Sequence, residues 1–173
     1  MKEKKLVKKN ILELTPSATL AINEKCKQLI SEGKKVYKFG FGQSPFPVPE
    51  KIVSSLIENA EKKDYLPMQG LPVLRDSIAK NLSNLTKNNF VKENVLITPG
   101  SKEGMYLMHV AFDGEIILPS SSWVSYAPQA KIANNKVHWL STSRENNWFP
   151  TAEQIEKKVK TIGKKNILLI INS

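Results

Sequence analysis

The spacing of hydrophobic residues changes partway along the chain. In the first part, apolar residues recur every three or four positions, as in amphipathic helices. A first helix is predicted from the cap residues Ser17 or Thr19 to Gly33, a second from Pro49 and a third from Pro72. The residues expected to be buried are Leu20, Ile22, Cys26, Leu29 and Ile30, then Ile52, Val53, Leu56 and Ile57, then Leu74, Ile78, Leu82 and Leu85.

From Asn94 onward, short apolar runs alternate with helical segments. The runs VLIT, EIIL, KVHWL and ILLII are predicted strands, and helices are expected at about 102–112, 123–134 and 152–162. Thr151 and Gln154 form a predicted capping box for the last helix. Strands separated by helices are typically parallel, so the expected fold class is α/β with a parallel-strand core. Asn172 and Ser173 would lie at the carboxyl end of the last strand, the edge where such sheets bind ligands.

The net charge of +10 raises the question of a nucleic-acid partner. The lysines are spread along the chain, and Arg75 and Arg144 are the only arginines. Because arginine is the usual bidentate reader of phosphates and bases, a solvated lysine-rich surface is favoured and no nucleic-acid partner is expected.

Cysteine, histidine and hydropathy patterns exclude several classes of protein. The single cysteine, Cys26, excludes an internal disulfide framework and suits a reducing compartment. His109 and His138 have no cysteine or carboxylate cluster at ligand spacing, so no metal site is expected. No apolar run approaches the roughly 20 residues that span a membrane, and the basic N-terminus lacks the apolar segment of a secretory signal. A soluble, cytoplasmic protein without a membrane partner is predicted.

The segment VLITPGSKEGMYLM combines a predicted strand end, a turn and a helix start. The first turn of a helix has unpaired N–H groups and the positive end of the helix dipole, which together bind phosphate. Gly100 would allow close approach of a ligand and Ser101 would add a hydroxyl group. The alternative is a simple strand-to-helix turn with a serine cap. The glycine spacing matches neither a Walker loop nor a dinucleotide fingerprint.

Three further residues are candidates for a site. Trp123 follows the next strand, so it should lie at the same sheet edge as Gly100 and could stack on a planar ring. Gly42, in a proline-rich loop, could present its N–H to a carboxylate, and Tyr65 precedes the helix that begins at Pro72. Taken singly, a packed core tryptophan and a turn glycine explain Trp123 and Gly42 better, and Tyr65 alone says little.

Taken in order, several segments resemble the N-terminal half of class I/II aminotransferases, which are fold-type-I enzymes that use pyridoxal 5'-phosphate (PLP). The segments are LTPSATLAINEK, FGFGQSPFPVPE, DYLPMQGLPVLRDSIA, VLITPGSKEGMYLM, EIILPSSSWVSYAPQAKIA and NILLIINS. The resemblance runs from about Leu14 to Ser173. It implies an incomplete PLP-dependent transferase fold of the aspartate-aminotransferase-like type. Residues 1–70 would form an N-terminal arm and small-domain segment, and 71–173 the N-terminal part of the large, PLP-binding domain.

The resemblance also implies roles for single residues. Gly100, Ser101 and Lys102 occupy the turn that holds the cofactor phosphate, and Trp123 matches the aromatic residue that stacks on the pyridine ring. Tyr65 matches the tyrosine that reaches the partner's cofactor phosphate across a homodimer. Gly42 matches a loop glycine that meets the substrate carboxylate.

The family continues beyond the last strand with a Pro-x-Asn-Pro-Thr-Gly loop, which is absent here, as are the Schiff-base lysine and the aspartate partner of the pyridinium nitrogen. No catalytic residue is therefore assigned. The resemblance implies an N-terminal fragment of an enzyme that transfers an amino group from an amino acid to a 2-oxo acid, and we expect this chain alone to be inactive. The alternatives are another fold-type-I PLP enzyme (a lyase, decarboxylase or cyclopropane-forming synthase) and a non-enzymatic basic fragment.

Overall fold

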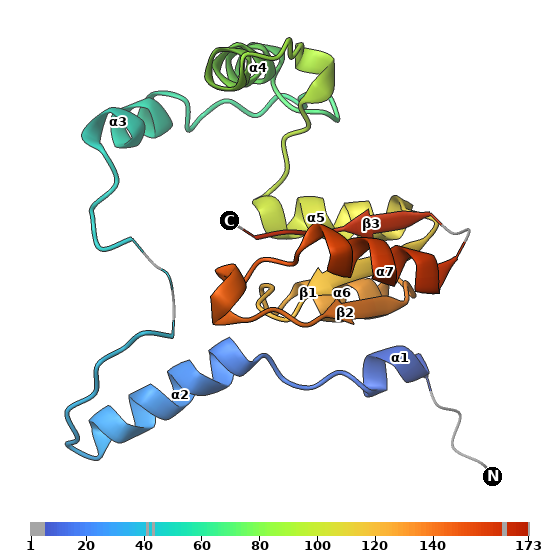
Figure 1. Cartoon of the computed structure of the whole chain (residues 1–173). Helices are drawn as coiled ribbons and strands as arrows, with labels where there is room; N and C mark the ends of the chain where they lie inside the picture. The colour runs from blue at the N-terminus through green and yellow to red at the C-terminus, as the bar shows by residue number, and fades with distance from the viewer. Residues whose placement is uncertain (1–5, 41, 43, 164–165, 173) are drawn as a thin grey trace. The chain divides into compact units, whose positions relative to one another are not determined.

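The computed structural model describes residues 6–40, 42, 44–163 and 166–172 (Figure 1). The chain divides into two compact units. The first unit, here called the sheet unit, combines residues 1–41 with 100–173, and the second, the helical unit, comprises residues 42–99. This division by contacts differs from the expected boundary between residues 70 and 71. The assignment of 1–70 and 71–173 to parts of a larger fold stays a prediction.

The sheet unit contains three parallel strands in the order β2-β1-β3. They are β1 (Glu115–Pro119), β2 (Val137–Leu140) and β3 (Ile167–Leu169), with Ile117 of β1 opposite His138 and Leu169. Every residue of the central strand β1 is buried. This confirms the predicted α/β class and three of the four predicted strands.

Three helices accompany these strands (Figure 1): α5 (Ser101–Ala111) precedes β1, α6 (Tyr126–Ile132) connects β1 to β2, and α7 (Ala152–Ile162) connects β2 to β3. The core consists of Ile116, Leu118, Ala130 and Ile170, with Met105 of α5 and Tyr126 and Ala127 of α6 packed against it. The helix predicted at 152–162 is confirmed with its capping box, in which Thr151 Oγ1 accepts the Gln154 N–H at 3.2 Å and Gln154 Oε1 accepts the Thr151 N–H at 2.9 Å. Helix α6 begins three residues later than expected, because residues 123–126 first form a turn in which the Tyr126 N–H donates to the Trp123 carbonyl at 3.2 Å.

The N-terminal segment of the sheet unit contains α1 (Lys9–Leu12) and α2 (Ala18–Ser31). The side-chain amide of Asn10 donates to the Lys131 carbonyl at 2.9 Å, and Glu13 forms an ion pair with Lys131 at 3.0 Å. These contacts attach the segment to the C-terminal end of α6. The short helix α1 was not anticipated, because four residues give no readable hydrophobic period.

The helical unit contains α3 (Glu50–Glu58), α4 (Pro72–Thr86) and the 3₁₀ turn η1 (Lys92–Asn94). Buried Arg75 of α4 donates from Nε to the Val95 carbonyl at 2.8 Å and from a terminal nitrogen to the Lys92 carbonyl at 2.7 Å. A second 3₁₀ turn, η2 (Arg144–Asn146), belongs to the sheet unit.

The predicted strand VLIT is not a strand in the structure. Val95 has extended dihedral angles, φ −118° and ψ 124°. However, its carbonyl accepts from Arg75, and the Ile97 N–H donates to the Gln69 carbonyl at 3.0 Å. A strand requires a neighbouring strand for its ladder, and within the described residues VLIT has none.

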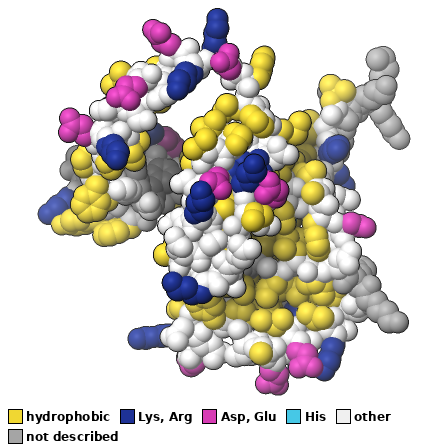
Figure 2. Space-filling view, turned by 90° about the horizontal axis from the view of Figure 1, so that it is seen from above, with side chains coloured by type: hydrophobic (Ala, Val, Ile, Leu, Met, Phe, Trp, Pro, Cys, Tyr) yellow, Lys and Arg dark blue, Asp and Glu magenta, His cyan; other side chains and the backbone are white. Residues whose placement is uncertain are grey.

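The predicted burial of α3 is also wrong. Ile52, Val53, Leu56 and Ile57 are 58%, 41%, 71% and 69% exposed. Leu74 and Leu85 of α4 and Leu20 of α2 are exposed too, and Figure 2 shows hydrophobic side chains at the surface. An amphipathic pattern identifies which face of a helix is apolar but not whether another element covers it.

Candidate functional site

The first turn of α5 begins at Gly100, which has φ 87° and ψ 158°. This backbone region is essentially restricted to glycine. A Cβ atom added at Gly100 would meet no heavy atom within 4 Å, so the conformation, and not crowding, calls for glycine here. Ser101 is the first helical residue, and helix starts of this kind direct N–H groups at an anion.

Lys102 and Trp123 lie together at this turn. The ammonium nitrogen Nζ of Lys102 is 5.3 Å from the centroid of the Trp123 ring, within the range of a cation–π interaction. The Trp123 side chain packs edge-on against Tyr126, with ring centroids 5.4 Å apart and an interplanar angle of 79°. Because Trp123 remains 40% exposed, part of its surface is available to a planar ligand.

The carboxyl ends of the strands converge beside Trp123. Asn172, which follows β3, accepts the Trp123 backbone N–H through Oδ1 at 3.2 Å and donates from Nδ2 to the Tyr126 hydroxyl at 3.4 Å. At the ends of β1 and β2, the hydroxyl groups of Ser120 and Thr142 are 2.8 Å apart. Asn172 therefore lies at the sheet edge expected from the sequence, and Ser173 lies outside the described residues.

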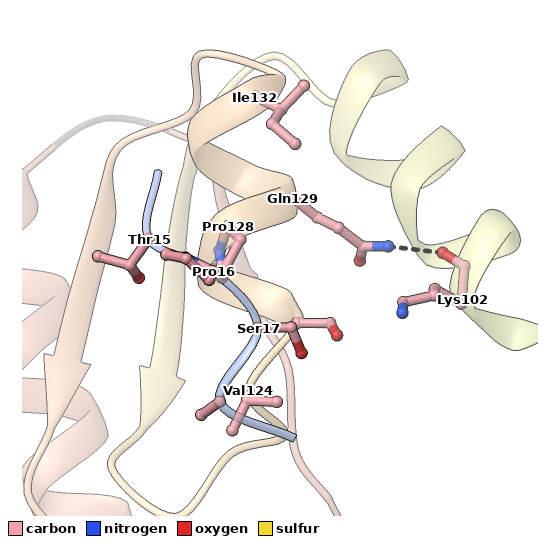
Figure 3. A pocket seen from close by; sticks show the side chains of 10 residues that line it. Thr15, Pro16, Ser17, Lys102, Val124, Pro128, Gln129 and Ile132 are labelled. Atoms are coloured by element: carbon pink, nitrogen blue, oxygen red, sulfur yellow. Dashed lines mark hydrogen bonds between the residues drawn. The ribbon is translucent and has the colours of Figure 1, made fainter. Parts of the chain in front are cut away.

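A pocket of 390 Å³ adjoins the first turn of α5 (Figure 3). The buried side chain of Gln129 lies at its wall, and Nε2 of Gln129 donates to the Lys102 carbonyl at 2.7 Å. Figure 3 shows the N-terminal segment passing over α6 here. The pocket is lined by Thr15, Pro16, Ser17, Ala18, Lys102, Val124, Ser125, Pro128, Gln129 and Ile132.

The charges in this part of the sheet unit are mixed. Lys102 brings a positive charge to the first turn of α5, and the neighbouring Glu103 brings a negative one. Near the other end of α5, His109 is fully buried, and this burial lowers its pKa below the usual value of 6.5. His109 is therefore neutral at neutral pH.

The two remaining predicted site residues, Tyr65 and Gly42, belong to the helical unit. The Tyr65 side chain is fully exposed, and Gly42 is exposed between two residues that the structure does not describe. Their assignments stay predictions, as do the cofactor-binding roles of Gly100, Ser101, Lys102 and Trp123.

No group of three or more metal-ligating side chains occurs among the residues with described positions. His138 of β2 pairs instead with the buried carboxylate of Glu115 on β1. None of the helices in the described ranges is both long and apolar enough to cross a membrane.

Comparison with known proteins identifies the family. Residues 34–173 match the family model for aminotransferase class I and II. The chain belongs to this family. It is 34% identical over 170 residues to an aspartate aminotransferase of Geobacillus stearothermophilus, a match that covers 95% of this chain and 42% of the relative. A second aspartate aminotransferase, from Bacillus subtilis, is 32% identical with the same coverage.

Solved aminotransferase structures have the same fold. An aspartate aminotransferase of Thermotoga maritima matches with a TM-score of 0.80 and 29% identity, covering 88% of this chain and 42% of the other. The Thermus thermophilus aspartate aminotransferase with maleate matches with a TM-score of 0.85 and 26% identity, covering 96% and 44%. The expected family and the partial aspartate-aminotransferase-like fold are confirmed. This chain spans less than half the length of these relatives.

Some features of the site were missed by the sequence interpretation. These features all bring together residues that are distant in sequence. They are the bond from Gln129 to Lys102, the contribution of Thr15–Ala18 to the pocket wall, and the contacts of Asn10. For Gln129, the available signal was an amide side chain among apolar positions of a helix, which is uncommon unless it is hydrogen-bonded.

Proposed function

We propose that this chain forms the N-terminal part of a PLP-dependent aminotransferase that transfers an amino group from an amino acid to a 2-oxo acid. The observation that carries the proposal is the proximity of the Lys102 ammonium group, at the first turn of α5, to the exposed ring of Trp123. A phosphate group and a planar ring on one small molecule match these two features. The proposed location is the cytoplasm.

The residues present fit such a cofactor. The 11-residue helix α5 and the open space beside Gly100 suit a phosphate at the helix start. The indole of Trp123 would stack on the pyridine ring, while Asn172 and Tyr126 fix the position of Trp123. When bound, PLP supplies an electron sink for the bonds at the substrate's α-carbon. The side chains of this chain would bind and orient it.

Two further roles complete the proposal. Tyr65 would reach the cofactor phosphate of a second copy in a homodimer, and Gly42 would meet the substrate carboxylate through its backbone N–H. Full exposure of the Tyr65 ring agrees with a partner in another chain. Because relatives at 30–34% identity are named aspartate aminotransferases, aspartate is the first amino donor to test in the complete enzyme.

The cofactor site can be tested on this chain by equilibrium dialysis against pyridoxamine 5'-phosphate. This probe lacks the aldehyde that reacts with surface lysines, and pyridoxamine is the control without phosphate. We expect saturable binding of the phosphorylated probe only, weakened in Trp123→Leu and unchanged in Trp139→Leu, which alters an exposed tryptophan on β2. Equal binding of both probes, or equal loss in both variants, would contradict the proposal.

We also predict that this chain alone has no transaminase activity. No lysine here occupies the context in which the family attaches its cofactor. Incubation with PLP, aspartate and a 2-oxo acid should give no transamination, and borohydride should fix no adduct at one specific lysine. Turnover by residues 1–173 would show that this chain contains catalytic residues that have not been recognised.

A further inference from the structure

Gln129 connects helix α6 to the first turn of helix α5. Its side chain is 8% exposed, and its Nε2 donates to the carbonyl of Lys102, the second residue of α5, at 2.7 Å. Figure 3 shows this bond spanning the space between the two helices. The bond joins residues 27 positions apart, so it belongs to the tertiary structure.

The other half of the same amide is unsatisfied. Gln129 Oε1 is buried and has no hydrogen-bond partner in the part of the chain that the structure describes. A buried acceptor without a partner is destabilising, whereas an apolar side chain of similar size carries no such penalty. The Lys102 carbonyl also lies within α5, where carbonyls accept helical N–H groups. Global stability alone therefore does not favour glutamine over methionine at this position.

The bond has a local effect on the candidate site. Terminal turns of helices fray, and the first turn of α5 includes both Ser101 and Lys102. A donor fixed on α6 holds the Lys102 backbone, and with it the direction of the neighbouring N–H groups and the start of the Lys102 side chain over Trp123.

We infer that Gln129 is a positioning residue that fixes the anion-binding first turn of α5 without touching the ligand. The inference rests on the proposed function, because it assumes that this turn holds a phosphate. It predicts an unusual pair of effects for Gln129→Met: weaker binding of a phosphorylated ligand together with unchanged or higher stability.

The test compares this variant with Gln154→Met. Gln154 also donates from Nε2 to a backbone carbonyl, that of Ser141, but it belongs to the capping box of α7. In equilibrium dialysis against pyridoxamine 5'-phosphate, Gln129→Met should bind about threefold to tenfold more weakly, the effect of one hydrogen bond. Its melting temperature should not fall. Gln154→Met should melt at a lower temperature and bind the probe as the wild type does.

Hydrogen exchange without ligand gives a second readout. The peptide covering 100–108 should exchange faster in Gln129→Met, while peptides from β1 and β3 stay unchanged. Gln129→Leu repeats the comparison with a second apolar side chain, and a clearly lower melting temperature in both variants would count against the inference.

Equal probe binding by Gln129→Met and the wild type would overturn the inference alone, as would equal weakening in Gln154→Met or unchanged exchange at 100–108. If the wild type shows no phosphate-dependent binding, the proposed cofactor site fails, and the inference with it.

Discussion

Replacing Gly100 with alanine should destabilise the chain and weaken its phosphate-dependent binding. Gly100 adopts φ 87° and ψ 158°, a conformation that costs other residues about 1–3 kcal/mol. Because an added Cβ would meet nothing within 4 Å, the whole cost arises in the backbone. The variant can relieve the strain by rotating φ, which redirects the N–H groups at the start of α5 away from the phosphate position.

Gly163→Ala is a matched control. Gly163 has φ 85° and ψ −150°, also faces open space, and lies at the C-terminal end of α7. Both variants should lose about 1–3 kcal/mol in urea denaturation, or about 2–4 °C in melting temperature for each kcal/mol. In dialysis against pyridoxamine 5'-phosphate, only Gly100→Ala should bind more weakly, by about tenfold or more. Wild-type affinity in Gly100→Ala, or equal weakening in both variants, would refute the reasoning.

Three further predictions concern stability or self-association. Burial lowers the pKa of His109, so the folded chain takes up this proton at a lower pH than the unfolded chain does. Stability should therefore fall as pH decreases below about 6.5. His109→Leu should flatten this dependence in urea titrations, and an unchanged slope would count against the assignment. Thr151→Ala should lower the free energy of unfolding by about 1 kcal/mol, because it removes the cap of α7, and Thr151→Ser should stay close to the wild type. Equal losses in the two variants would contradict this role of the hydroxyl group. Because large apolar side chains such as Leu56 and Ile57 are exposed, residues 1–173 should self-associate as concentration rises, as measured by light scattering. A chain that stays monomeric at all concentrations would contradict this.

Local signals in the sequence predicted most of the sheet unit. The run Ile167–Ile171 contains strand β3, and the segment EIIL, which is apolar after Glu115, makes up most of strand β1. The Thr151–Gln154 pair marked the start of α7 at the observed residue. Such signals work because capping boxes and short apolar runs depend on neighbours within a few positions.

Features that depend on distant partners could not be predicted in the same way. VLIT has the composition of a strand, but the carbonyl of Val95 accepts from Arg75, a residue that the sequence interpretation treated only as charge. The apolar face of α3 was visible, whereas its exposure was not.

The same distinction between local signals and distant partners applies to the candidate site. The sequence predicted that the turn at Gly100 and Trp123 lie close together, and Lys102 of that turn does lie over the Trp123 ring. The premise that VLIT is a parallel strand ending at this edge was wrong, however, so the proximity does not depend on a strand there. The contact of Gln129 with the Lys102 carbonyl depends on how α5 and α6 pack, which no spacing in the sequence encodes.

The most direct test of the account is to map the binding site of pyridoxamine 5'-phosphate on ¹⁵N-labelled residues 1–173 by NMR. Saturable shifts should be concentrated on the amides of Gly100, Ser101 and Lys102 and on the indole N–H of Trp123, with little response to pyridoxamine. Shifts concentrated on the lysine-rich helix α7, or equal responses to the two probes, would contradict it.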